Sequence, residues 1–90
     1  MERIFVVLDR FEIPGKGLAL TGAIEDDSKQ IHEGSTVMLK RPGLPDLLTV
    51  ATGFELIRNC WSPHKPRNVV LLIPIEVGLE NVPLKSEVWV

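Results

Sequence analysis

Glycine and proline interrupt this chain at short intervals, so no apolar segment continues for long. Seven Gly and seven Pro are distributed among 90 residues, and the runs between them are rich in Val, Ile and Leu. No window long enough for a helix keeps an apolar stripe of 3.6-residue period with caps at its ends. The pattern therefore predicts an all-β chain of short strands joined by turns.

These glycines and prolines divide the chain into six predicted strands, at residues 4–13, 18–25, 36–40, 47–57, 69–73 and 87–90. Pro74 is expected to end the fifth strand, because proline cannot donate to a strand ladder. Closure of such strands removes sheet edges that would otherwise invite aggregation. We therefore expect residues 1–90 to form one domain, a small six-stranded closed or nearly closed β-barrel.

Alternation of apolar and polar residues predicts which side chains face the interior of this barrel. Gly22 shares the inner face of its strand, where a glycine usually marks a bulge or a close backbone approach. Ile31 is expected to plug the core, Gly34 to turn the chain into the third strand, and Trp89 to be core or interface. The predicted inner residues of the longer strands are Val7, Phe11 and Ile13, then Leu18, Leu20 and Ile24, then Leu48, Val50, Phe54 and Leu56.

Composition and charge restrict the class of protein. The net charge of −2 argues against a domain whose main task is to grip a nucleic-acid backbone, although a local basic patch remains open. The single Cys60 cannot form an internal disulfide, which favours a cytoplasmic location. The first eleven residues lack the features of a signal peptide, and the apolar run 69–75 is far shorter than a bilayer span. No membrane segment is therefore expected.

The segment Pro14-Gly15-Lys16-Gly17 resembles a phosphate-binding loop at first sight. Pro14 suits the second position of a type II turn, and Gly15 accepts the positive φ that the third position requires. A Walker loop would need an earlier Gly where Arg10 stands, Ser or Thr after the Lys, and a following helix. We therefore predict a hairpin turn between two strands.

Other chemical sites find little support in the sequence. The acidic residues Asp26 and Asp27 lack the spacing of a calcium loop. Cys60 and His64 fall short of the three or four ligands that zinc prefers, and no oxyanion site accompanies them. We expect no metal, no cofactor and no enzymatic activity.

The segment from Arg58 to Arg67 is the most informative surface, because it places cations beside Trp61 in an acidic protein. Such a cluster can stack on a base and meet phosphates. It can equally form a protein-binding hot spot, or Trp61 can fold back over an open end of the barrel while the cations stay solvated. Its cations are Arg58, Lys65 and Arg67.

Five segments, in order, resemble the second domain of elongation factor Tu and other translational GTPases, a six-stranded β-barrel. They are FEIPGKGLALTGAIE, IHEGSTVML, TVATGFELIR, RNVVLLIPI and NVPLKSEVWV, which cover nearly the whole chain. In that family the first strand ends in Phe and a small-Gly-basic-Gly turn, and the second strand contains Thr-Gly. An Ile or Val, followed two or three residues later by Gly, opens the third strand. A Gly-x-Glu-x-x-Arg segment lies in the fourth strand, and Asn-Val begins the fifth. In this chain these features are Phe11 and Gly15-Lys16-Gly17, Thr21-Gly22, Ile31 and Gly34, Gly53-Glu55-Arg58, and Asn68-Val69.

The resemblance implies a non-catalytic binding module that engages RNA, either tRNA or rRNA, or a ribosome-associated partner. By resemblance, Glu55 lies near the terminal adenosine of aminoacyl-tRNA, Asn68 lies beside the aminoacyl pocket, and Arg58 lies close to both. The implied binding residues are Glu55, Arg58, Trp61, Lys65, Arg67 and Asn68.

Alternatives remain. Glu55 and Asn68 can instead satisfy backbone N–H groups in connecting loops. The chain departs from the family at Ala23 and at Pro74-Ile75, where Arg and Arg-Gly are usual, and both changes weaken a tRNA assignment. Without a GTPase domain to wall the pocket, we expect weak binding and no GTP hydrolysis. The other function that fits is a protein-interaction module, such as a small regulator, immunity protein or decoy.

Overall fold

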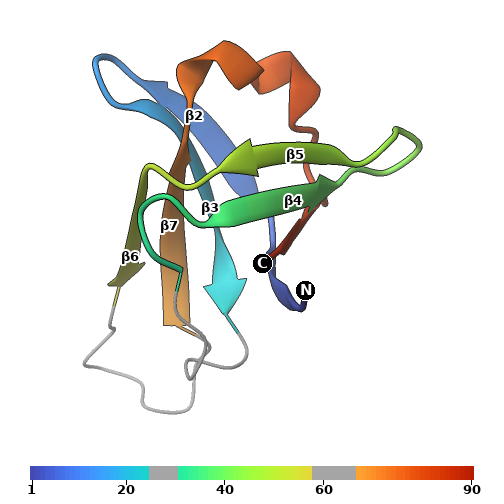
Figure 1. The fold of residues 1–90 in the computed structure, drawn as a ribbon, viewed down its shortest axis with the longest axis horizontal. Coiled ribbons are helices and arrows are strands. Elements are labelled where there is room, and N and C mark those ends of the chain that lie inside the picture. The colour runs from blue at the N-terminus through green and yellow to red at the C-terminus, as the bar shows by residue number, and fades with distance from the viewer. Residues whose placement is uncertain (25–30, 58–66) are drawn as a thin grey trace.

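The computed structural model of the protein describes residues 1–24, 31–57 and 67–90. In this part of the chain, eight strands form two four-stranded antiparallel sheets (Figure 1). The first sheet has the order β1 (Arg3–Val6), β8 (Glu87–Trp89), β4 (Thr36–Lys40) and β5 (Leu47–Val50). The second has the order β2 (Asp9–Ile13), β3 (Gly17–Ile24), β7 (Arg67–Ile73) and β6 (Gly53–Ile57).

Helical structure in the described residues is limited to two short 3₁₀ turns, η1 (Ile75–Val77) and η2 (Leu79–Asn81), which follow Pro74. The all-β prediction is therefore confirmed, and Pro74 ends its strand as expected. None of the described helices is long or apolar enough to span a lipid bilayer.

Of the expected closed or nearly closed six-stranded barrel, the structure supports the all-β architecture, but the described strands form two sheets, because two of the six predicted strands each divide into two. The predicted strand 4–13 is β1 followed by β2, and the predicted strand 47–57 is β5 followed by β6. Each of these pairs consists of an edge strand of the first sheet and an edge strand of the second. The hydrogen-bonded pairings of the described residues do not run round as one closed barrel.

Successive backbone amides show how the chain changes sheet at the first bend. The N–H of Val7 donates to Ser86 O, just before β8, at 2.8 Å. The next N–H, of Leu8, donates to Thr21 O on β3, also at 2.8 Å. The direction of hydrogen bonding therefore switches from the first sheet to the second within one residue, as at the corners of orthogonally packed sheets.

The second bend repeats this arrangement. The N–H of Ala51 donates to Ser35 O, just before β4, at 2.9 Å, and the N–H of Thr52 donates to Leu72 O on β7 at 2.8 Å. Ala51 itself is buried. A small side chain at this position allows the strand to turn while its methyl group stays in the core.

Because of these bends, part of the predicted set of inward-facing side chains is wrong. Val7 is buried, and Phe54 and Leu56 pack against the core as predicted. Phe11 is 44% exposed, Leu48 66% and Val50 42%, so their predicted inward orientation is wrong. A strand that turns at a corner changes which of its faces meets the core, so one alternation cannot be carried through both halves.

The core fills the space between the sheets and receives side chains from both of them. Ile31 is buried as predicted, and Leu18, Leu20 and Ile24 form the inner face of β3. At Gly22 the backbone of β1 comes so near that an added Cβ would lie 2.3 Å from Val6 O. The remaining buried apolar residues are Ile4, Phe5, Val7, Ala19, Val37, Leu39, Ala51, Val69, Leu71, Ile73, Val82 and Val88.

The opening turn and the start of the third strand are both confirmed. The N–H of Lys16 donates to Ile13 O at 3.0 Å across Pro14 and Gly15, and Gly15 has a φ of 78°. Lys16 therefore leads into β3 and heads no helix. Gly34, with a φ of 91°, turns the chain into β4 as predicted.

Candidate functional site

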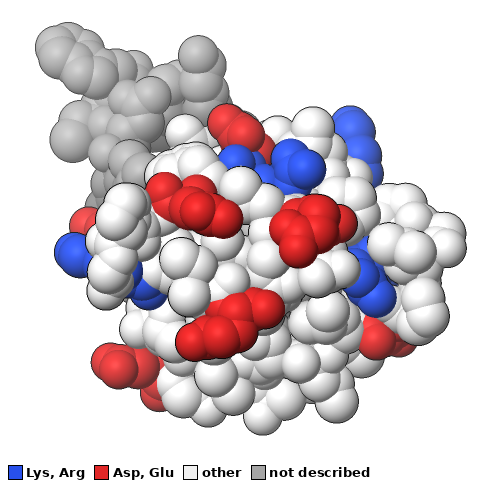
Figure 2. Space-filling view, turned by 90° about the horizontal axis from the view of Figure 1, so that it is seen from above, with Lys and Arg blue, Asp and Glu red and all other residues white. Residues whose placement is uncertain are grey.

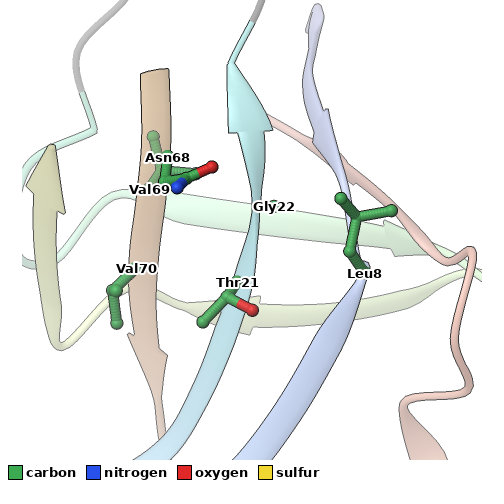
Figure 3. Close-up of a pocket in the computed structure, with 6 residues that line it drawn as sticks. All are labelled: Leu8, Thr21, Gly22, Asn68, Val69 and Val70. Carbon is green, nitrogen blue, oxygen red and sulfur yellow. The ribbon is translucent and has the colours of Figure 1, made fainter. Parts of the chain in front are cut away.

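A pocket of about 300 Å³ opens on the outer face of the second sheet. Figure 3 shows Leu8 on one side, Asn68 and Val70 on the other, and Thr21 and Gly22 between them. Strands β3 and β7 are paired across its floor, with Thr21 opposite Val70 and Gly22 opposite Val69. Because Leu8 occupies the bend between β1 and β2, the change of sheet itself forms one wall of the pocket.

The polar groups of the pocket come from Thr21 and Asn68. The hydroxyl of Thr21 donates to Asp9 O on β2 at 3.3 Å. Asn68 is exposed, and its amide reaches from β7 toward Gly22 on β3 (Figure 3). Since an amide presents both donors and an acceptor, Asn68 can bind a ligand that carries either type of group.

Glu55 and Asn68, which the resemblance places at an RNA-binding site, lie on the same face of this sheet. Glu55 pairs with Val70, and Ile57, two residues further along β6, pairs with Asn68. Residues two apart on a strand share a face, so Glu55 and Asn68 are diagonal neighbours on adjacent strands. Both residues are exposed.

Of the other predicted binding residues, the structure describes only the backbone of Arg67. Arg67 begins β7 and pairs with Ile24 through the backbone. Arg58, Trp61 and Lys65 lie outside the described residues, as do Cys60, His64, Asp26 and Asp27. The hypothesis of a basic cluster around Trp61 therefore stays a prediction.

Sequence reasoning missed Leu8 and Thr21 as pocket residues. Leu8 falls within the predicted strand 4–13, which gives no reason to expect an exposed apolar residue at a corner. The only available signal was Asp9, which interrupts the alternation directly after it. The sequence marks Thr21 only as part of a Thr-Gly motif. For Gly22 it predicts a bulge or a close backbone approach, and the structure shows that the approaching backbone is that of β1.

The described lining of the pocket is uncharged, and strand pairing sets the carboxylates of Asp9 and Glu55 on the same face of the sheet. At the end of the molecule that carries η1 and η2, acidic and basic side chains lie interspersed (Figure 2). Glu76 and Glu80 contribute acidic groups there. The face in this view therefore offers no single basic surface for a phosphate backbone.

A second cluster lies on the outer face of the first sheet, around Trp89. The indole N–H donates to Glu87 Oε1 at 2.9 Å, and Arg3 Nη1 lies 3.4 Å from Glu87 Oε2. Lys40 Nζ lies 4.1 Å from the centre of the indole ring, within the range of a cation–π contact. Trp89 itself is half-buried.

This cluster lowers the pKa of the Glu87 carboxyl below its ordinary value. The main cause is the hydrogen bond from Trp89, which stabilises the carboxylate. Partial burial opposes this effect, whereas Arg3 and Lys40 add smaller favourable contributions. The arrangement links β1, β8 and β4, which is typical of a structural role.

No three His, Cys, Asp or Glu side chains of the described residues come together in a way that could hold a metal ion. Comparisons of the chain with family models, with curated proteins and with solved structures gave no match.

Proposed function

We propose that the chain is a non-catalytic RNA-binding module of the translation-factor β-barrel type, which receives an unpaired RNA end on the outer face of its second sheet. The observation that carries the proposal is that Glu55 and Asn68 are diagonal neighbours on one exposed face, with the pocket beside Asn68. A terminal nucleoside offers hydroxyl groups and a base edge that a carboxylate and an amide can bind.

The course of the chain supports the barrel type. Both edge strands of the first sheet continue, through the bends at Val7-Leu8 and Ala51-Thr52, into edge strands of the second. When each divided pair is taken as one bent strand, the described residues contain six strands, the number expected of the translation-factor barrel. The order of the segments FEIPGKGLALTGAIE to NVPLKSEVWV supports the same assignment.

Titration with a labelled RNA oligonucleotide that ends in an unpaired adenosine tests this function, with fluorescence anisotropy as the readout. We expect weak binding at low salt that weakens further as salt rises, because contacts of the predicted cations Arg58, Lys65 and Arg67 with phosphates release counterions. Asn68→Ala removes amide hydrogen bonds and should weaken binding by roughly three- to tenfold.

The matched control is Thr36→Ala, which changes an exposed residue of the first sheet and should leave binding unchanged. A DNA oligonucleotide of the same sequence measures the contribution of the 2′-hydroxyl groups. Flat titration curves at low salt, or an equal loss in both variants, would contradict the proposal.

A second candidate function is protein interaction, and the exposure of large apolar side chains on the described surface favours it. Leu8 is 57% exposed and, with Phe11, brings apolar surface to the second sheet. Apolar contacts are much less sensitive to ionic strength than phosphate contacts are. A partner bound with little salt dependence, together with no RNA binding, would select this function.

A further inference from the structure

Strand β5 is an open edge of the first sheet. It pairs with β4 along one side, with Thr36 opposite Val50 and Met38 opposite Leu48. In the part of the chain that the structure describes, no strand pairs with its other side. An edge of this kind presents backbone N–H and C=O groups to any chain that can add a strand.

The hydrogen bonds of Ala51 show which residues of β5 direct their backbone groups outward. Ala51 N donates to Ser35 O at 2.9 Å, and Gly34 N donates to Ala51 O at 2.7 Å, so Ala51 is bonded to the chain entering β4. Bonded and non-bonded positions alternate along an antiparallel ladder. Thr49 and Leu47 are therefore bonded to β4, whereas the N–H and C=O of Leu48 and Val50 point to the open side.

The side chains of Leu48 and Val50 make the same edge apolar. Both are exposed on the outer face of the sheet. Cross-strand pairing sets Met38 beside Leu48 and Trp89 beside Met38. An apolar stripe therefore runs from Trp89 across β4 to the open edge at Leu48.

The three other sheet edges carry charged residues, which discourage the addition of a strand. Strand β1 has Arg3, β6 has Glu55, and β2 has Asp9, Arg10 and Glu12. The sequence of β5 is LLTV, which contains neither a charge nor a proline. It is the one edge of the described sheets that lacks this protection.

We propose that β5 pairs with β5 of a second copy of this chain, in antiparallel orientation about a two-fold axis at Thr49. In this register Leu48 stands opposite Val50 of the second copy, and both are residues whose backbone groups point outward. Each such pair exchanges both of its backbone hydrogen bonds, as a bonded antiparallel pair requires. The two apolar stripes then meet across the axis.

A second copy suits this edge, because the edge is complementary to itself. The two-fold axis brings outward-pointing residues opposite each other without any shift of register, and no like charges within β5 face one another. A four-residue strand forms only a short interface, so a reversible equilibrium between monomer and dimer is expected.

Sedimentation equilibrium over a range of concentrations tests the proposal with the wild-type chain, Leu48→Lys and Val50→Lys. We expect a reversible dimer in the wild type and a dissociation constant raised by about tenfold or more in each variant, because lysine on an edge opposes strand pairing. Leu84→Lys is the matched control, since Leu84 is 47% exposed in the turn before β8 and should leave the dimer intact.

Amide hydrogen exchange followed by NMR gives a second measurement that does not depend on a variant. The amides of Leu48 and Val50 should become more protected as the protein concentration rises, whereas the amides of Leu47 and Thr49 should be protected throughout. A monomer at every concentration up to about 1 mM would overturn the proposal. So would a dimer that survives both lysine substitutions, or protection that does not change at Leu48 and Val50.

Discussion

At the residue scale, Gly22 is a position where β1 of the first sheet approaches β3 of the second very closely. A Cβ at this position would lie 2.3 Å from Val6 O and 2.6 Å from Phe5 Cδ2, so the β1 backbone itself would have to move. We predict that Gly22→Ala lowers the free energy of unfolding by about 3 kcal/mol, as severe overpacking does. Urea denaturation measures this value, and a loss below about 1 kcal/mol would show that β1 does not press on β3 at this point.

Gly15 differs from Gly22, because its backbone conformation alone, and no close neighbour, favours glycine. Its φ is 78°, and nothing lies within 4 Å of the position where a Cβ would stand. Gly15→Ala should therefore cost only the strain of a left-handed conformation, about 1–2 kcal/mol. The same denaturation experiment compares the two variants, and a larger loss at Gly15 than at Gly22 would contradict the steric argument.

At the element scale, the turns could be predicted from the sequence because their residues have special backbone requirements. Pro14-Gly15 and Gly34 each supply an angle that few other residues adopt, and both turns occur where predicted. The strand bends could not be predicted in this way. Val7-Leu8 and Ala51-Thr52 contain neither glycine nor proline, and each bend depends on which strands accept hydrogen bonds from successive amides.

The candidate site, like the strands, could be predicted only in part. The resemblance alone names Glu55 and Asn68, and their common face follows from the pairing of β6 with β7. The predicted fifth strand begins at Val69 and leaves Asn68 outside it, because the residues before it carry no apolar alternation. Leu8 could not be assigned, since its exposure arises from the bend between two sheets. A corner residue is defined by contacts with strands distant in sequence, and no local pattern marks these contacts.

The cluster around Glu87 holds three strands of the first sheet together and predicts a dependence of stability on pH. The pKa of the Glu87 carboxyl is lowered in the folded state. The ionised carboxylate therefore contributes stability that is present above the ordinary value of 4.5 and is lost as pH falls through the folded-state pKa. We predict that Glu87→Gln destabilises the protein near neutral pH and that this difference shrinks below pH 4.5. Thermal unfolding at several pH values measures it.

Trp89→Phe tests the cause of this effect, because it keeps an aromatic ring under Lys40 and removes the hydrogen bond from the indole N–H. The pH dependence contributed by Glu87 should become smaller in this variant. A pH profile of the difference between wild type and Glu87→Gln that stays flat through the acid range would contradict the assignment of the hydrogen bond.

At the scale of the whole molecule, one core joins both sheets, and the chain crosses between them at each bend. Leu39 on β4 and Leu71 on β7 are both fully buried in this core, although they belong to different sheets. Neither sheet can therefore lose its inner face without exposing that of the other, so the two sheets should unfold as one cooperative unit.

This cooperativity can be tested with one substitution in each sheet. Leu39→Ala and Leu71→Ala should each lower the free energy of unfolding by about 2–5 kcal/mol, through lost burial and the cavity left behind. Tryptophan fluorescence and far-ultraviolet circular dichroism should give coincident transitions in both variants, because a perturbation in one sheet is shared by the other. Leu84→Ala, at an exposed position, should change stability by less than about 0.5 kcal/mol. Separate transitions in either core variant would mean that the bends connect two units of independent stability, and the shared core would then not govern folding.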